Sequence, residues 1–355
     1  MKTNKRYKCL ALPLVMGSLF TATADEVVLE LEQSEDMTNW TSVEVTPEML
    51  SPEGKIEMGE SADAGFFRLR VEIVGGPVPA GFVEIPAGSF EMGDSFDEGD
   101  SDELPVHTVN VSRFYMQSTE VTNAQMAEVM NWAYGQGLVT ASTSTVQNEN
   151  GDAEELLDMN SSYIRLSWTG SEIVVDSGFE AHPVVEVTWF GAVAYCQFRS
   201  QMDGLTPCYD FSDWSCDFTK NGYRLPTEAE WEKAARLAAA TAGETWRYPF
   251  GNSIDSTKAN YNGNNGGTQD VGSYSATAGL NDMAGNVWEW CHDWYGSSYY
   301  SSSPGADPTG PASGSHRVLR GGSWNFSARG CRVAYRRSFS PGFKNDRFGF
   351  RPVRR

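Results

Sequence analysis

The 355-residue sequence has few of the residues that carry most metal and nucleophile chemistry. It has four histidines, no two of which stand at zinc-ligand spacing. It has no Cys-x-x-Cys, His-Glu-x-x-His or phosphate-binding-loop motif, and the Gly-Ser pairs at Gly88 and Gly322 lack the Gly-x-Ser-x-Gly pattern of hydrolases. These absences make zinc enzymes, P-loop nucleotidases and serine hydrolases poor candidates.

Positive charge is also scarce, since 27 basic residues stand against 47 acidic ones and the net charge is -20. The acids concentrate in residues 25–105, and such a surface repels phosphate backbones and anionic headgroups. We therefore expect no nucleic-acid partner. The acidic run 94–103 suggests a cation site, but we expect a solvated loop because acids without fixed geometry chelate poorly.

Long apolar runs are absent after the first 24 residues. Residues 1–24 combine a basic start, an apolar stretch over 9–20 and Ala-Thr-Ala at 22–24, a pattern typical of a signal peptide. The alternative is an uncleaved membrane anchor, which Pro13 and Gly17 disfavour. We expect an exported protein, periplasmic or secreted, with no membrane span after signal cleavage.

Cysteines are few, and removal of the signal peptide leaves an odd number in an oxidising compartment. The five that remain are Cys196, Cys208, Cys216, Cys291 and Cys331. At most two disulfides can form. We expect Cys208 to pair with Cys216, because the two flank a short loop whose closure costs little entropy.

Alternation of apolar and polar residues predicts two regions of β-structure. Residues 27–32 and 66–72 alternate and predict a small β module over 25–75, followed by a Gly/Pro-rich boundary at 75–81. Further strands are predicted at 82–86, 90–92 and 107–115.

Start signals place three helices in the longer region that follows. Thr122 and Thr227 each head a capping box, which predicts helices through Trp132 and over 231–240. A third helix is expected near 190–202. After Ala240 the sequence is rich in Gly, Asn, Ser and Trp, which favours irregular backbone with short strands.

The segment 279–290 has the composition of a cation-binding loop. Carboxylates at Asp282 and Glu289 flank a flexible Gly285, so that side-chain and carbonyl oxygens could converge on a hard cation. On spacing alone, a turn anchored by Trp288 and Trp290 is the better account.

Ten arginines and one lysine stand against Asp346 in residues 317–355. Read alone, this composition suggests a nucleic-acid patch. Arginines spread over irregular loops are poor indicators of a groove binder. We expect their guanidinium groups to bridge acids and loop carbonyls in the core.

Several motifs occur in a fixed order and together resemble the formylglycine-generating enzyme family, also called sulfatase-modifying factors. They occupy residues 86–93, 120–123, 223–232, 282–290, 320–324 and 349–351. The resemblance covers residues 81–355 and implies an α+β, C-type-lectin-like fold with low regular secondary structure, preceded here by the small all-β module.

The resemblance also implies structural calcium. One site would use the Asp282 side chain, the carbonyl oxygens of Gly285 and Val287, and the Glu289 carboxylate. A second site would use Asn260 and the carbonyl oxygen of Tyr261. Oxygen-only ligands of this kind suit Ca²⁺.

Members of this family oxidise a sulfatase cysteine to formylglycine with O2 and Cu(I), which two cysteines five positions apart hold as thiolates. Counting from the Gly-Gly-Ser element, this chain has Phe326 at the first position and Cys331 at the second. The resemblance makes Cys331 the candidate catalytic residue in a groove with Trp288, Ser323 and Trp324. The partner would be a sulfatase or another exported protein.

Besides the enzymatic interpretation, two non-catalytic interpretations are open. Cys331 could form a disulfide with Cys291, leaving Cys196 as the odd thiol and the fold as an exported binding or scaffold module. A third reading is a lectin-like protein that displays ligand-binding loops over 325–345. One thiolate cannot reproduce a two-thiolate Cu(I) site, so the sequence leaves the activity open.

Overall fold

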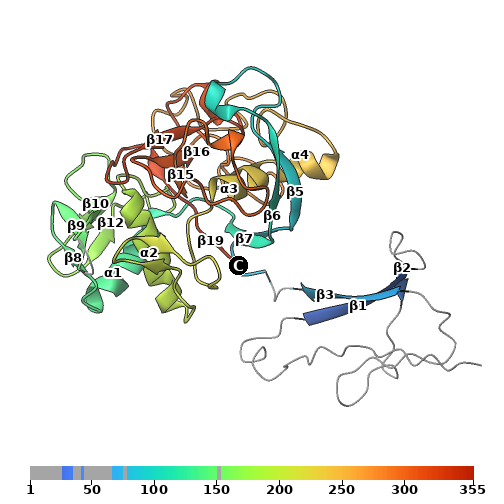
Figure 1. Cartoon of the computed structure of the whole chain (residues 1–355). Coiled ribbons are helices and arrows are strands. Elements are labelled where there is room, and N and C mark those ends of the chain that lie inside the picture. Colours follow the sequence, from blue (N-terminus) through green and yellow to red (C-terminus); the bar gives the residue numbers. More distant parts are fainter. Residues whose placement is uncertain (1–25, 35–40, 44–65, 75–77, 150–152) are drawn as a thin grey trace, which may run out of the picture. The chain divides into compact units, whose positions relative to one another are not determined.

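The computed structural model describes residues 26–34, 41–43, 66–74, 78–149 and 153–355 (Figure 1). The predicted signal peptide lies outside these residues. The chain divides into two units, 1–78 and 79–355, and each is described by itself. In the described residues, no helix is both long and apolar enough to cross a bilayer.

The first unit contains an antiparallel sheet in the order β2-β1-β3, built from β1 (Glu26–Ser34), β2 (Thr41–Val43) and β3 (Phe66–Val74). The long pairing of β1 with β3 places Leu29 opposite Val71 and Glu30 opposite Arg70. The strands predicted at 27–32 and 66–72 are confirmed.

The second unit is an α+β domain with little regular structure, as the sequence predicted. Its largest sheet has the order β17-β16-β15-β18. A three-stranded sheet has the order β19-β7-β4, and β5 pairs with β6. The strands of these sheets are β4 (Phe82–Ile85), β5 (Gly88–Met92), β6 (His107–Val111), β7 (Phe114–Gln117), β15 (Trp288–Trp294), β16 (Arg317–Arg320), β17 (Arg337–Phe339), β18 (Phe348–Gly349) and β19 (Val353–Arg354).

Smaller hairpins and sheets lie between α1 and α3 in the chain. They are formed by β8 (Val139–Ala141), β9 (Thr145–Asn148), β10 (Glu155–Asp158), β11 (Leu166–Trp168), β12 (Ile173–Val175), β13 (Tyr209–Asp210) and β14 (Ser215–Cys216). Figure 1 shows β8–β10 and β12 gathered with α1 and α2 on one side of the domain, away from β15–β17.

Capping threonines precede three of the helices, and those at Thr122 and Thr227 are the predicted ones. α1 (Asn123–Gly135) starts after Thr122, α2 (Trp189–Met202) after Thr188 and α3 (Glu228–Ala235) after Thr227, and each threonine side chain accepts a backbone N–H of the first turn. The helix predicted over 231–240 is instead two, because α4 (Leu237–Ala242) follows a break at Arg236. Arg236 turns its guanidinium to Glu232 and to the Gly93 carbonyl.

Buried arginine–carboxylate pairs hold the irregular loops together, as the sequence predicted for the C-terminal arginines. Arg351 donates two hydrogen bonds of 2.7 Å to the Glu289 carboxylate, and Arg336 donates two of the same length to the Glu228 carboxylate. These side chains are almost fully buried. Paired guanidinium and carboxylate groups satisfy each other where water is excluded.

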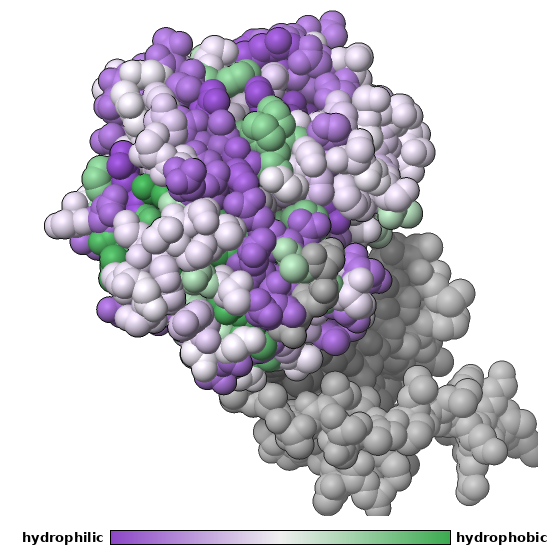
Figure 2. Space-filling model, turned by 90° about the vertical axis from the view of Figure 1, so that its left-hand side faces the viewer, coloured by the Kyte–Doolittle hydropathy of each residue, from purple (hydrophilic) through white to green (hydrophobic). Residues whose placement is uncertain are grey.

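The acidic loop 94–103 is not simply solvated, and that expectation was wrong for two of its acids. Glu103 is fully buried and accepts two hydrogen bonds from Arg332, while Asp94 accepts the N–H groups of Phe96, Glu98 and Gly99. Arg332 lies far from this loop in the sequence, and its hydrogen bonds hold Glu103 in the interior of the domain. On the face shown in Figure 2, hydrophobic residues form only small, separate patches among hydrophilic ones.

Candidate functional site

The loop 282–289 reaches its conformation through residues that tolerate a left-handed backbone. Asp282 and Asn286 have φ values of 56° and 57°, and Gly285 has φ 85°. A Cβ at Gly285 would lie 2.2 Å from the Asn260 carbonyl oxygen, so only glycine fits. The sequence pattern therefore specifies a tight turn against Asn260.

Glu289 lies at the end of this loop, on β15, and is fully buried. Its carboxylate accepts hydrogen bonds from Arg351 and from the Trp231 indole, the latter at 2.7 Å. One of its oxygens, Oε1, accepts only the Arg351 bond in the described residues. Glu289 is thus fixed in place with acceptor capacity remaining.

Two more carboxylates share this buried region. Burial raises the pKa of Asp282 to about 6, and the neighbouring Glu289 charge acts in the same direction. Burial raises the pKa of Glu120 well above its usual value, and the charges of Asp282 and Glu289 add to this effect. Glu120 Oε1 accepts a hydrogen bond from Asn286, but its Oε2 is buried without a partner in the described residues.

The residues of the first predicted calcium site fit a cation. Three buried acids share one buried guanidinium, that of Arg351, so ionisation of all three would leave the region with excess negative charge. The described residues contain no cluster of three or more acidic, histidine or cysteine side chains arranged around a metal position. The predicted site would use only two carboxylates, completed by two backbone carbonyl oxygens.

The residues of the second predicted calcium site are engaged elsewhere. The Asn260 amide oxygen accepts a hydrogen bond from Asn265, and its amide nitrogen donates to Gly267 and Asn286. The Tyr261 carbonyl accepts the N–H of Asn264. These two oxygens close loops, and they do not fit a cation site in this arrangement.

Cys331, the candidate catalytic residue, is buried with 1% of its surface exposed. Its sulfur lies so close to Gly322 that a Cβ there would come within 2.8 Å of it. Burial raises the pKa of the Cys331 thiol to about 12. The thiol is therefore neutral near pH 7, and no charge in the described part of the chain offsets the effect of burial as it does for reactive cysteines.

Phe326 stands where the first copper-binding cysteine would be and fills that space with a ring. A Cβ at Gly330 would lie 2.2 Å from Phe326 Cδ1, which shows how tightly the ring packs on the backbone beside Cys331. The ring also makes an edge contact with Trp288, at 5.2 Å between centroids. No ligand for Cu(I) other than Cys331 is supplied by these positions.

The predicted groove residues come together here but are largely covered. Trp288 and Ser323 are buried, while Trp324 is half-buried and donates its indole N–H to the Asp346 carbonyl. Partly exposed side chains surround them, namely Phe326, Tyr335, Arg337, Phe339 and the exposed Phe343. The Arg337 guanidinium lies 5.1 Å from the Phe326 ring and 5.0 Å from the Phe339 ring.

All five described cysteines are free thiols in the structure, so neither predicted disulfide is formed in it. Cys208 and Cys216 nevertheless lie in contact, because β13 pairs with β14 and the two thiols share a hydrogen bond. Cys291 and Cys331 lie in different hydrophobic clusters. The structure brings the first pair together and separates the second.

Sequence reasoning missed Glu120, Arg351 and Arg337 as members of this region. Glu120 and Arg351 lie inside motifs used to recognise the family, but nothing local to either residue shows that they meet Asp282 and Glu289. The contact is made by the tertiary fold.

A comparison with protein families matches residues 76–355 to the sulfatase-modifying factor enzyme 1-like domain. The chain belongs to this family. The match covers the whole second unit, and the fold neighbours agree with it.

Known relatives span different kinds of protein. The chain is 34% identical to the formylglycine-generating enzyme of Streptomyces coelicolor, over 76% of this chain and 88% of that protein. It is 36% identical to the serine/threonine-protein kinase Pkn1 of Chlamydia trachomatis, over 79% of this chain and 39% of the kinase. The chain thus spans about two fifths of the length of the first curated relatives it matches.

Among solved structures, the Treponema denticola variable protein 1 has a similar fold. It superposes with a TM-score of 0.58 at 29% identity, over 77% of this chain and 94% of that one. Membership of the family is therefore shown by sequence and by fold together, while the chemistry depends on the residues of the site.

Proposed function

We propose that this chain is an exported, non-catalytic binding module built on the sulfatase-modifying factor fold. The observation that carries the proposal is the substitution in the copper position, where the Phe326 ring packs on the backbone at Gly330. The remaining Cys331 is buried and its pKa is raised to about 12. The competing proposal, oxidation of a sulfatase cysteine to formylglycine, requires a second thiolate.

Two physical requirements of the enzymatic reading are missing at this site. Cu(I) needs soft ligands in a near-linear pair, and a phenyl ring supplies none. A thiol that attacks a substrate or binds a metal reacts as the thiolate, and burial disfavours that form for Cys331. The site residues therefore do not fit Cu(I).

The same positions are suited to binding a polypeptide. Aromatic residues and arginine are the types enriched in the energetic centres of protein interfaces. On the partly exposed side of the site, Phe326 and Phe339 lie against the Arg337 guanidinium, Tyr335 packs against Phe326 and Phe343 stacks on Phe339. Under this proposal the partner is an exported protein, with a sulfatase as one candidate.

Calcium at the first site forms part of the proposal. Asp282, Glu289 and the carbonyl oxygens of Gly285 and Val287 would hold the ion and fix the 282–289 turn beneath Trp288. The support is the excess of buried acids over buried guanidinium groups and the unpartnered Glu120 oxygen nearby. Bound Ca²⁺ would supply charge neutralisation and rigidity.

Export and one disulfide complete the proposal. Signal-like residues 1–24 support export, and contact between Cys208 and Cys216 supports a disulfide in an oxidising compartment. Cys291 and Cys331 would remain thiols, since they belong to separate clusters.

An aldehyde assay tests the absence of catalysis. The full chain, incubated with Cu(I), O2 and a peptide bearing Cys-x-Pro-x-Arg, should produce no aldehyde at any copper level. Aldehyde formation by the unchanged chain would overturn the proposal.

The variant Phe326→Cys provides a matched comparison, because it places a second thiol at the position where copper-binding members of the family have a cysteine. We expect this variant to bind one Cu(I) per chain, whereas the unchanged chain binds none at that position. Adding Cys331→Ser to the variant should remove the bound copper again, which ties the metal to the two sulfurs.

A further inference from the structure

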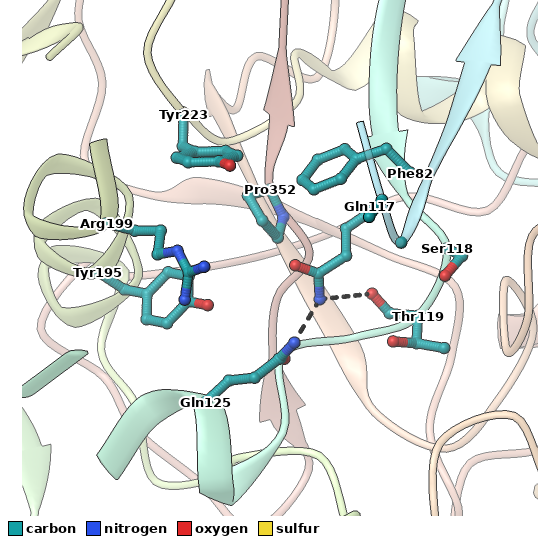
Figure 3. A pocket seen from close by; sticks show the side chains of 11 residues that line it. Phe82, Gln117, Ser118, Thr119, Gln125, Tyr195, Arg199, Tyr223 and Pro352 are labelled. Atoms are coloured by element: carbon teal, nitrogen blue, oxygen red, sulfur yellow. Dashed lines mark hydrogen bonds between the residues drawn. The ribbon is translucent and has the colours of Figure 1, made fainter. Parts of the chain in front are cut away.

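A separate cavity of about 160 Å³ opens between α1, α2 and the β19-β7-β4 sheet (Figure 3). Its volume is similar to that of a cavity that admits one six-membered ring, about 150 Å³. Its lining includes Gln117 from β7, Gln125 from α1, and Tyr195 and Arg199 from α2. None of its lining residues belongs to the groove around Cys331.

Tyr195, whose ring is buried, turns its hydroxyl toward this cavity. Only 2% of the residue is exposed, and in the described part of the chain its Oη has no hydrogen-bond partner. Figure 3 shows the hydroxyl at the cavity side of the ring. Oη is open to the cavity rather than sealed in the core, so a ligand hydroxyl there can bond to it in place of solvent.

Gln117 adds an acceptor. Its amide nitrogen donates to the Thr119 carbonyl at 3.2 Å and to Gln125 Oε1 at 3.4 Å. These bonds orient the amide so that its oxygen faces the cavity (Figure 3), where the described residues give it no donor. Gln117 is itself buried, with only 7% of its surface exposed.

The charge of Arg199 is already compensated. Its Nε donates to Asp203 at 3.0 Å and its Nη1 to Glu128 at 3.3 Å, and Tyr223 also donates to Asp203. An anionic ligand would have to compete with two carboxylates. Among the described lining residues none is acidic, so a cation finds no counter-charge there either. A neutral ligand is favoured.

The opposite side of the cavity is apolar. Phe82 and Tyr223 lie with ring centroids 5.7 Å apart, and Pro352 lies beside them. Figure 3 shows these three on one side and Tyr195, Arg199 and Gln125 on the other. A ligand that fills the cavity must combine an apolar face with an edge of donors and acceptors.

We propose that this cavity binds a single neutral hexopyranose ring, as a free monosaccharide or as the terminal sugar of a glycan. A pyranose has an apolar C–H face for Phe82 and Tyr223, and its hydroxyl groups both donate and accept. One hydroxyl would donate to Gln117 Oε1, and another would bond to Tyr195 Oη. The site is independent of copper, calcium and the groove around Cys331.

Titration calorimetry of the full chain with D-glucose, D-galactose and D-mannose tests the proposal, each up to 100 mM. At least one hexose should bind, and Tyr195→Phe should weaken that binding about tenfold, the loss of one hydrogen bond of roughly 1.4 kcal/mol. Absence of binding by all three sugars would overturn the proposal.

Two comparisons separate binding from folding and neutral from anionic ligands. Tyr195→Phe should leave the free protein as stable as before, because the lost hydroxyl has no partner, and the exposed Tyr163→Phe should leave sugar binding unchanged. Sodium benzoate, a ring with a carboxylate, should not compete. Benzoate binding in place of sugar, or equal sugar binding by Tyr195→Phe, would contradict the assignment.

Discussion

At the scale of single residues, burial rather than identity decides what the titratable groups do. Cys331 is a plausible nucleophile by position, yet its buried surroundings keep it a thiol. Glu289 would be costly in the core, but Arg351 and Trp231 satisfy its oxygens. On the surface, a cysteine thiol would ionise more readily and a glutamate carboxylate would need no partner to stay charged.

His292 makes stability depend on pH. Its ring packs against Trp189, Tyr209 and Phe218, and burial together with Arg317 and Arg224 lowers its pKa to about 3. The unfolded chain protonates this histidine below about pH 6.5, whereas the folded chain does not. Stability is therefore lost as the pH falls from about 6.5 toward 3.

Urea unfolding at pH 7 and pH 5 measures this effect against His292→Phe. The unchanged chain should lose about 1–2 kcal/mol more than the variant over this interval, at roughly 1.4 kcal/mol per pH unit below the unfolded pKa. The exposed His316→Phe serves as the control and should keep the loss of the unchanged chain. Equal losses in all three proteins would contradict the prediction.

Thiol counting tests the cysteine arrangement. The exported chain, denatured without reductant, should show three free thiols, because Cys208 and Cys216 are in contact whereas Cys291 and Cys331 lie in different clusters. Cys208→Ser should raise the count to four by freeing Cys216. A count of one would mean that Cys291 and Cys331 are linked.

At the scale of elements, local signals place helix starts better than helix ends. Thr122 and Thr227 mark the starts of α1 and α3, because capping uses atoms only a few residues apart. The break at Arg236 depends instead on Gly93, far away in the sequence, whose carbonyl accepts from the guanidinium. No local pattern reports that contact.

The α3 cap is a measurable part of stability. Thr227 Oγ1 accepts the Glu230 N–H, and Glu230 accepts the Thr227 N–H at 2.8 Å. Thr227→Ala should therefore destabilise the domain by about 1 kcal/mol. Thr241→Ala, in the exposed part of α4, should change stability by less than about 0.5 kcal/mol. Equal effects of the two changes in denaturant unfolding would refute the role of the cap.

At the scale of the whole molecule, hydrogen bonds and ion pairs between distant segments hold the second unit together, since it has few long helices and strands. Glu120, the loop that carries Asp282 and Glu289, and Arg351 come from three separate parts of the chain and meet in one buried region. A cation there would tie these segments together, so its loss should be felt as a loss of global stability.

Calcium removal should lower the unfolding temperature. A ligand at one hundred times its dissociation constant stabilises a protein by about 2.7 kcal/mol, which corresponds to roughly 5–10 °C for a domain of this size. EDTA should cause such a decrease, and added Ca²⁺ should reverse it. Asp282→Asn should reduce the response, whereas Asp270→Asn, on an exposed side chain, should retain it. An unfolding temperature indifferent to EDTA would remove calcium from the proposal.

The sequence by itself determined the family domain, the helix starts, the paired arginines and the absence of the first copper cysteine. These features depend on ordered motifs or on residues close in the chain. The tertiary structure alone decided that Cys331 is buried, that Glu120 joins Asp282 and Glu289, and that Cys291 is separated from Cys331. Burial and charge balance arise from segments far apart in sequence, so no local pattern could specify them. The sequence shows that position 326 is not a cysteine. Only the structure shows that the Phe326 ring packs against the backbone at Gly330 and fills the space.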